Sequence, residues 1–510
     1  MTNLNTDYEK LLSQNKELTI VESTESIVHW DMETKMPPRA IDLRSLQLSQ
    51  LSRIEHKLAT DRQIGVLLNR IEKSPEYESL DSVRKRNIHL IRKNYDEQTK
   101  LPERLVSETE RQRVVTINVW KNAKATKDFQ LFKPQLEKLF KLRMQAAEIL
   151  MDVKGTPTSY DALIDIYEQK MTSETIAKVF DELKRKLVVL INKCQSVPRQ
   201  PDLSILKSRV PTDIQRKISD SLAEYIGYDV TSKNAGGRID ETEHPFTTGY
   251  FDDVRITTHY YEDNLFSSIF SVLHEGGHAL YEQYLKKEWM YQPIGSAPSM
   301  GFHESQSRFV ENMVGRSTEF WEYYLPKLKT IAGATFKGAS LSDFVRAVNS
   351  VKPSKIRIEA DEVTYSLHII IRFEIERDLF LGKLKISELP NAWNEKYKSY
   401  LGLDIENDAE GVMQDTHWAG GDFGYFPSYA LGNIYGGQIL SKMVDDIPDW
   451  RTQIAGGNYL NIREWLVKNI YDRGNLFDPP DLLRRVTGKQ IGVNDFIGYL
   501  NEKYSQIYGF

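Results

Sequence analysis

The sequence predicts one large, mainly α-helical body with a small β-element. Apolar residues recur at helical spacing through long charged segments, such as residues 131–153 and 176–194. Similar patterns cover residues 266–287, 300–315 and 356–381, as well as several segments nearer the C-terminus. The one clear strand signal is FDDVRITTHYY from Phe251, where Val254 and Ile256 alternate with polar residues. We therefore expect a short strand beside many helices.

Two proline-bearing segments divide the helical pattern. Pro37 and Pro38 predict a break or sharp turn within residues 29–40, because proline cannot continue a helix interior. The polar stretch from Pro198 to Pro211 predicts a joint between an N-terminal helical lobe, about residues 1–200, and a second lobe, about residues 201–510.

Composition excludes several classes of protein. The 510 residues are 40% hydrophobic and 27% charged, as in an ordinary globular protein. A net charge of −5 offers no broad basic surface for nucleic acid, and no apolar run approaches the roughly 20 residues that span a membrane. Cys194 is the only cysteine, so intrachain disulfides are impossible. Because the N-terminus lacks the apolar core of a signal peptide, we expect a cytoplasmic location.

Residues 274–278 read His-Glu-x-x-His within a helical pattern. This spacing places His274 and His278 one turn apart, so that both imidazoles can bind one metal ion. Glu275 lies farther round the helix, where it can act as general base on a metal-activated water. The same pattern could instead be two structural histidines on a helix face, a less specific interpretation that we reject.

Gly276 and Gly277 interrupt this helix at a cost of roughly 1 kcal/mol each relative to alanine. Both fall within or beside the apolar stripe of the helix. We infer that another backbone crosses the helix closely there, and that Gly277, at the edge of the stripe nearest His274, helps to leave the metal site uncrowded.

A catalytic zinc needs a third protein ligand, which this helix does not provide. Glu282 lies about 12 Å along the axis from His274, too far to reach the same ion. The next helical segment, from Ser299, offers Glu304 and Glu311 one heptad apart. Residue spacing leaves either of them as the third ligand, and the other as an orienting partner for an imidazole.

Beyond the metal motif, the sequence resembles the carboxypeptidase Taq family of zinc metallocarboxypeptidases. The matching motifs, in chain order, are His244-Pro245-Phe246; Asp253, Arg255 and Thr257; His274 to His278; His303-Glu304-Ser305-Gln306; Ile356-Arg357 with Ala360-Asp361; and Gly411, Gln414-Asp415 and His417-Trp418.

This resemblance implies a fold similar to neurolysin and angiotensin-converting enzyme, with a deep active-site groove in a single catalytic domain covering residues 1–510. It implies Glu304 as the third ligand, Zn²⁺ as the cofactor, and a homodimer. It also implies peptide substrates with a free C-terminus. Co²⁺ is an alternative metal, because cobalt binds similar nitrogen and oxygen sites.

A carboxypeptidase must bind the terminal carboxylate of its substrate, and a bidentate arginine suits that role. The resemblance favours Arg357 and adds Gln414, whereas a local ion pair between Arg357 and Asp361 is the competing interpretation. Arg255 is a second candidate, although it could pair with Asp253 on the same strand face. We also expect the strand from Asp253 to be an edge strand that pairs with extended substrate.

Peptide hydrolysis needs a hydrogen-bond donor for the developing oxyanion. The candidates are Tyr425, Tyr429 and His417, and the sequence does not choose between the two tyrosines. His303 could orient a ligand or line the substrate pocket.

Removal of single C-terminal residues is therefore the leading hypothesis. The alternative is an oligopeptidase that cuts inside short peptides and needs no carboxylate clamp. A zinc aminopeptidase is less consistent with the sequence, because the G-x-M-E-N type of motif that holds a substrate's amino terminus is absent. A scaffold with a structural metal is less consistent because structural zinc sites are usually cysteine-rich.

Overall fold

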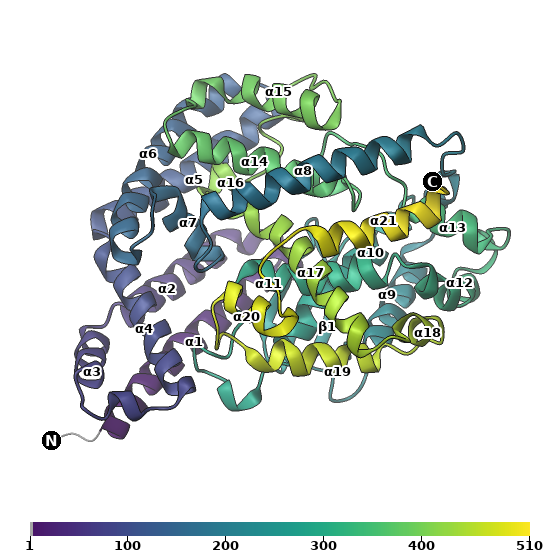
Figure 1. The fold of residues 1–510 in the computed structure, drawn as a ribbon. Coiled ribbons are helices and arrows are strands. Elements are labelled where there is room, and N and C mark those ends of the chain that lie inside the picture. Colours follow the sequence, from purple (N-terminus) through teal and green to yellow (C-terminus); the bar gives the residue numbers. More distant parts are fainter. Residues whose placement is uncertain (1–3) are drawn as a thin grey trace.

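The computed structural model describes residues 4–510 and is built mostly from helices (Figure 1). The helices that precede the sheet are α1 (Leu4–Thr34), α2 (Ile41–Ala59), α3 (Arg62–Glu72), α4 (Ser82–Lys100), α5 (Glu103–Thr126), α6 (Phe129–Lys154), α7 (Ser159–Tyr167), α8 (Ser173–Ser196) and α9 (Thr212–Ile226).

The strands are β1 (Gly237–Glu241), β2 (Thr247–Tyr250) and β3 (Asp253–Thr258). The helices that follow them are α10 (Leu265–Gln283), α11 (Met300–Arg308), α12 (Thr318–Ala332), α13 (Leu341–Val348), α14 (Tyr365–Phe380), α15 (Leu389–Leu401), α16 (His417–Gly420), α17 (Phe426–Asp446), α18 (Trp450–Ala455), α19 (Leu460–Asn469), α20 (Pro479–Thr487) and α21 (Asn494–Tyr508). The prediction of a mainly α-helical protein is confirmed.

Side-chain caps set the starts of the helices that matter for the site. Thr158 caps α7 by accepting the backbone N–H of Asp161, and Ser299 caps α11 by accepting that of Phe302. The predicted break after α1 is also present, because the chain turns at Pro37 and Pro38 before α2 begins.

One large hydrophobic core contains residues from Trp120 to Tyr508. The segment between α8 and α9 is irregular, as its prolines predicted, yet residues on both sides of it contribute to this core. In Figure 1, α8 runs beside the C-terminal helix α21, and the two helices are in contact. A smaller apolar cluster joins α1, α3 and α4.

The sheet, the only one among the described residues, has the strand order β1-β3-β2. β3 is parallel to β1 and antiparallel to β2, so both of its sides are occupied. The prediction that the strand from Asp253 is an edge strand open to substrate is therefore wrong. The alternation of residues in β3 could not reveal that residues 237–241 form a parallel neighbour. The edge strand that contacts α10 is β2.

The helix predicted over residues 356–381 is shorter than expected. α14 begins at Tyr365, and Arg357 lies in a single 3₁₀ turn, Arg357–Glu359. Asp361 accepts the backbone N–H groups of Val363 and Thr364, and this local bonding competes with helix before α14.

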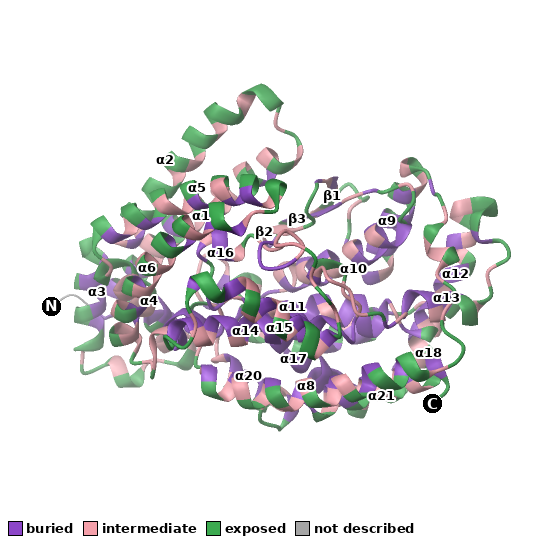
Figure 2. Ribbon diagram, turned by 90° about the horizontal axis from the view of Figure 1, so that it is seen from above, coloured by how far each residue is buried: buried purple, intermediate pink, exposed green. Residues whose placement is uncertain are grey.

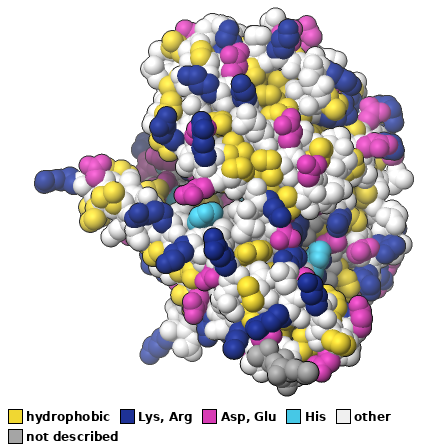
Figure 3. All heavy atoms as spheres, turned by 90° about the vertical axis from the view of Figure 1, so that its left-hand side faces the viewer, with side chains coloured by type: hydrophobic (Ala, Val, Ile, Leu, Met, Phe, Trp, Pro, Cys, Tyr) yellow, Lys and Arg dark blue, Asp and Glu magenta, His cyan; other side chains and the backbone are white. Residues whose placement is uncertain are grey.

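The surface agrees with the charge pattern of the sequence. On the face drawn in Figure 3, basic and acidic side chains are interspersed, so that face carries no patch of one sign. None of the helices within residues 4–510 is both long and apolar enough to cross a membrane.

Candidate active site

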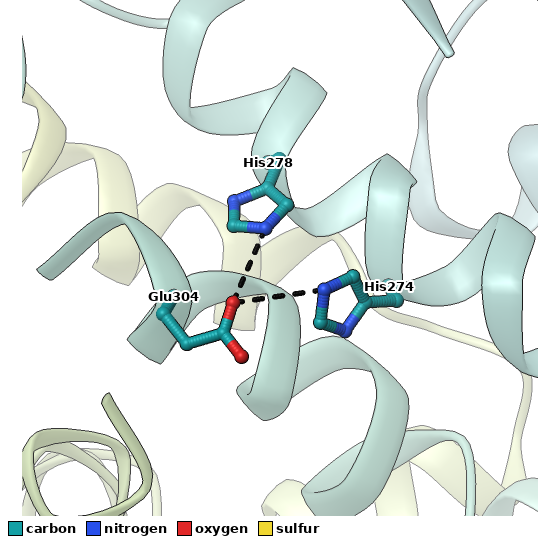
Figure 4. Close-up of side chains that lie close together, drawn as sticks. All are labelled: His274, His278 and Glu304. Atoms are coloured by element: carbon teal, nitrogen blue, oxygen red, sulfur yellow. Dashed lines mark ion pairs between the residues drawn. The ribbon is translucent and has the colours of Figure 1, made fainter. Parts of the chain in front are cut away.

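His274 and His278 on α10 meet Glu304 on α11 at the centre of the molecule. The Nε2 atoms of the two imidazoles lie 3.6 Å and 3.4 Å from Glu304 Oε2 (Figure 4). Within the described part of the chain, these three residues are the group whose ligand atoms could hold one metal ion. Of the two candidates for third ligand, the geometry brings Glu304 to this position.

Glu311 lies behind His274 rather than beside the ligand atoms. Its Oε2 is 2.9 Å from His274 Nδ1, which donates to it because a carboxylate can only accept. This bond keeps the proton on Nδ1 and leaves the lone pair of Nε2 directed at the site.

His278 is oriented by a longer relay through a third histidine. His303 Nε2 lies 2.8 Å from Glu282 and donates to it, which leaves Nδ1 of this ring to accept. His278 Nδ1 is 2.5 Å from that atom and supplies the proton. In the neutral form of each ring, these bonds leave Nε2 of both metal-facing imidazoles unprotonated. His303 has the orienting position that was one of its two expected places.

The electrostatics of the cluster favour a cation. Burial on its own would raise the pKa of Glu304, but Arg308 and His274 hold it well below its usual range. Burial lowers the pKa of His278 to about 3, so this ring is neutral. For His274, burial opposes protonation while Glu304 and Glu311 raise the pKa. A divalent cation at Nε2 would replace the proton that these two carboxylates favour.

The donor set fits zinc. Two imidazole nitrogens and one carboxylate oxygen make the three-ligand arrangement of catalytic zinc sites, which keep a fourth position open. Cobalt binds similar nitrogen and oxygen donors, so the ligands do not separate the two metals.

Glu275 is buried beside the ligands and accepts from Thr247 of the edge strand β2. The Thr247 hydroxyl lies 2.6 Å from Glu275 Oε2 and 3.0 Å from its backbone oxygen. Burial raises the pKa of Glu275 above its usual value. A carboxylate with a raised pKa, held next to a metal site, suits a general base. Sequence reasoning did not identify Thr247.

Gly277 explains the close approach of the two ligand helices. A Cβ on Gly277 would lie 2.6 Å from the backbone oxygen of Gln306 and 2.7 Å from Ser307 Cα, both on α11. The inference that another backbone crosses α10 here is confirmed. At Gly276 the neighbour is instead the side chain of Ile226.

Arg308 is a partly buried site residue that sequence reasoning missed. Its Nε donates to Glu304 Oε1 at 2.7 Å, and its Nη1 donates to Glu311 Oε2 at 3.2 Å. The spacing of an arginine four residues after one glutamate and three before another was the available signal. Arg308 neutralises both carboxylates and so stabilises the acidic cluster.

Arg357 pairs with Asp415, not with Asp361. Its Nε donates to Asp415 Oδ1 at 2.9 Å, and Arg372 donates to the other oxygen of the same carboxylate at 2.7 Å. Arg357 Nη1 donates to Tyr365, whereas Nη2 makes no hydrogen bond to any residue in 4–510. The local pair with Asp361 is thus excluded, and one edge of the guanidinium keeps a free donor.

Tyr425, Tyr429 and His417 lie together at the start of α17. His417 Nε2 is 3.2 Å from the Tyr429 hydroxyl, and the rings of Tyr425 and Tyr429 pack edge to face. Burial raises the pKa of Tyr425 to about 12 and also raises that of Tyr429, and the charge of Glu304 adds to both shifts. Both hydroxyls therefore keep their protons at neutral pH and lie near the ligand cluster.

Arg255 and Gln414 are engaged by neighbouring protein groups. Arg255 makes two 2.7 Å bonds to Asp253 and lies over the ring of Trp30. The Gln414 oxygen accepts the backbone N–H of Arg357 at 2.9 Å, and its amide nitrogen donates to the backbone oxygens of Lys355 and Glu410. These contacts place Gln414 as a support for Arg357.

Comparisons with known proteins agree over nearly the whole chain. A family model described as carboxypeptidase Taq (M32) metallopeptidase matches residues 10–504. The chain is 40% identical over 509 residues to thermostable carboxypeptidase 1 of Thermus thermophilus, covering 98% of this chain and 99% of that protein. It is 38% identical over 484 residues to carboxypeptidase 1 of Bacillus subtilis, covering 95% of each. The crystal structure of an M32 carboxypeptidase from Deinococcus radiodurans R1 superposes with a TM-score of 0.94 at 33% identity, covering 99% and 100%.

Proposed function

The chain belongs to the carboxypeptidase Taq (M32) family of metallopeptidases, and on this premise we propose how its residues carry out hydrolysis. It is a metallocarboxypeptidase. The oligopeptidase alternative is not favoured, because the relatives of this chain carry the name carboxypeptidase. The proposal concerns the metal, the roles of individual residues and the assembly.

His274, His278 and Glu304 would hold a zinc ion, with cobalt as the alternative. The observation that carries this assignment is the convergence of both Nε2 atoms on Glu304 Oε2. When bound, zinc supplies Lewis-acid activation of water and of the scissile carbonyl. Glu275 would take the proton from the attacking water and pass it to the departing amine, because its buried carboxylate has a raised pKa.

Arg357 would bind the terminal carboxylate of the peptide through its free guanidinium edge. Asp415 and Gln414 hold this arginine in place, while Arg255 stays a second predicted contact for substrate. Specificity for a free C-terminus follows from this charge pairing, since an amidated peptide offers no carboxylate.

The Tyr425 and Tyr429 hydroxyls are the proposed donors to the oxyanion. His417 is held neutral, because burial lowers its pKa to about 3. If Nε2 of the neutral ring donates to the Tyr429 oxygen, the Tyr429 proton is available for substrate.

The predicted homodimer is also a proposal, and the hairpin of α1 and α2 supports it. Within the described chain, Ala59 is the only buried residue of α2, which lies at the edge of the molecule (Figure 2). Leu43, Leu46 and Ile54 share one exposed face of it, and Leu46 is 70% exposed. A cytoplasmic location stays a prediction.

Mass spectrometry of one N-terminally blocked peptide and its C-terminally amidated twin tests the function. We expect loss of single C-terminal residues from the free acid only, abolished by chelation and restored by zinc. Internal cuts in both peptides would contradict the proposal.

A further inference from the structure

Two buried glutamates lie outside the machinery described so far. Glu168 and Glu376 are fully buried, and within residues 4–510 neither forms an ion pair with a lysine, arginine or histidine. Burying a carboxyl group without a charged partner is costly, so each group needs hydrogen bonds that compensate. Both find their donors on segments that carry site residues.

Glu376, on α14, accepts hydrogen bonds from both ends of the loop between His417 and Tyr425. Its Oε1 accepts from the Trp418 indole N–H at 2.8 Å, and Trp418 directly follows His417. Its Oε2 accepts the backbone N–H of Gly424 at 2.8 Å, and Gly424 directly precedes Tyr425. A single carboxylate therefore fixes the two residues that border the catalytic candidates.

The third donor to Glu376 comes from α7, which also backs the same loop. The Tyr160 hydroxyl donates to Oε2 at 2.9 Å. Gly424 has φ +88°, and a Cβ there would lie 2.8 Å from the backbone nitrogen of Ile164. The ring of Tyr167, at the end of α7, packs edge to face on Tyr425 with centroids 4.8 Å apart. The loop is thus held between α7 and Glu376.

Glu168 caps the C-terminal end of α7 and makes the equivalent contacts to α11 and α17. Its Oε2 accepts the backbone N–H of Gly301 at 2.9 Å and the Ser428 hydroxyl at 3.3 Å. The Tyr435 hydroxyl donates to Oε1 at 3.2 Å. Gly301 lies three residues before the ligand Glu304, and Ser428 directly precedes Tyr429.

We propose that Glu168 and Glu376 are positioning residues for peptide hydrolysis. Both are hydrogen-bonded to segments packed around α7, and together they fix the positions of Tyr425 and Tyr429 relative to Glu304. The inference rests on the oxyanion role given to these tyrosines in the proposed function. Neither glutamate touches substrate or metal, so each acts only through the residues it holds.

The chemistry of the donors makes the two sites respond differently to glutamine. The Trp418 and Gly424 N–H groups can only donate and lie on different oxygens of Glu376, so a glutamine would present its NH₂ to one of them. At Glu168 the partner of Oε1 is a hydroxyl, which can rotate and accept from a glutamine. Glu376→Gln should therefore be the more damaging change.

The test compares Glu376→Gln with Glu374→Gln, a matched control two residues away on α14. Glu374 pairs with Lys184 and Lys396, outside the site. For Glu376→Gln we expect kcat to fall about 10- to 100-fold, as for a small misplacement of a catalytic group, with KM and metal content unchanged. Glu374→Gln should keep wild-type kcat. Glu168→Gln should show a smaller loss than Glu376→Gln.

A double-mutant cycle separates positioning from general destabilisation. If Glu376 acts through Tyr425, Glu376→Gln should cost much less in a Tyr425→Phe background than in the wild type. Equal losses in both backgrounds, or an unchanged kcat in Glu376→Gln, would overturn the inference. If Glu376→Gln fails to fold, Tyr160→Phe removes one bond to the same carboxylate and should lower kcat severalfold at constant KM. An unchanged kcat in Tyr160→Phe would then overturn it.

Two further variants distinguish the inference from the function on which it rests. If Tyr425→Phe and Tyr429→Phe both keep full kcat, the oxyanion assignment is wrong and the inference falls with it. If they lose activity while Glu376→Gln does not, only the inference is wrong.

Discussion

Glu311 Oε2 lies 2.9 Å from His274 Nδ1, on the side of the imidazole away from the Nε2 atom that faces Glu304. The carboxylate thereby fixes both the tautomer and the orientation of a metal ligand without being a ligand itself. Replacing it by glutamine should loosen the metal.

For Glu311→Gln we expect metal affinity to fall about 10- to 100-fold, measured by competition with a chelator. The exposed Glu322 on α12 provides a control, and Glu322→Gln should bind metal as the wild type does. Unchanged metal affinity in Glu311→Gln would show that His274 does not need this partner.

Glu275→Gln tests the general base. The variant should keep its metal, because Glu275 lies outside the three ligand residues, and should lose kcat by about 10²- to 10⁴-fold. Metal analysis and peptide hydrolysis of the same preparation measure both quantities. Full hydrolytic activity with metal bound would refute the mechanism.

Arg357→Lys tests the carboxylate clamp. Lysine keeps the charge but cannot form two parallel bonds, so KM for a free-acid peptide should rise about tenfold or more. Arg255→Lys is the matched comparison, because Arg255 is engaged by Asp253 and Trp30. Equal rises in KM for both variants would contradict Arg357 as the main contact for the terminal carboxylate.

Asp415→Asn tests the buried ion network. Burial would raise the pKa of Asp415, but Arg372 and Arg357 hold it well below its usual range. Removing the charge leaves two buried guanidinium groups without their partner and should cost about 3–5 kcal/mol of unfolding free energy at pH 7.

The stability difference between the wild type and Asp415→Asn should decrease as the pH is lowered. The unfolded carboxyl group has a pKa of about 3.9, and the folded pKa is lower. The contribution is therefore complete above about pH 5 and declines as pH falls towards and through the folded pKa. Denaturant unfolding of the wild type and Asp415→Asn at pH 7 and below pH 4 should show a smaller difference in unfolding free energy at the lower pH. A difference that does not change with pH would contradict this prediction.

Leu46→Glu tests the proposed dimer surface on α2. A charge at this 70% exposed position should produce monomers, as measured by light scattering during gel filtration. Val189→Glu on α8 alters another exposed aliphatic residue and should leave the assembly unchanged. A monomeric wild type, or a dimeric Leu46→Glu, would exclude this surface.

Much of the fold and the metal site could be predicted, because the information is local in the sequence. Helical periodicity predicted a mainly helical protein, and His274, Glu275 and His278 lie within about one turn of the same helix. Gly277 indicated that another backbone crosses this helix closely. The choice of Glu304 over Glu311 depended on resemblance, because both lie on one face and only the packing of α11 against α10 separates them.

The rest depended on contacts between distant segments. β3 became a central strand because residues 237–241 pair with it, which its own alternation could not reveal. Arg357 pairs with Asp415, which is 58 positions away in the sequence, and not with the nearby Asp361. Thr247 on β2 donates to Glu275 on α10, and neither residue type carries a motif for that contact.

The support given by α7 has a consequence for folding. The bond between His274 and Glu311 joins residues 37 positions apart, whereas the bonds of Glu168 and Glu376 to α11, α17 and α7 span 133 to 267 positions. Contacts of high sequence separation form late, since the closure of a long loop must precede them. A metal-binding intermediate could thus exist before the catalytic tyrosines are in place, and metal content alone would overstate the fraction of active enzyme in a refolded preparation.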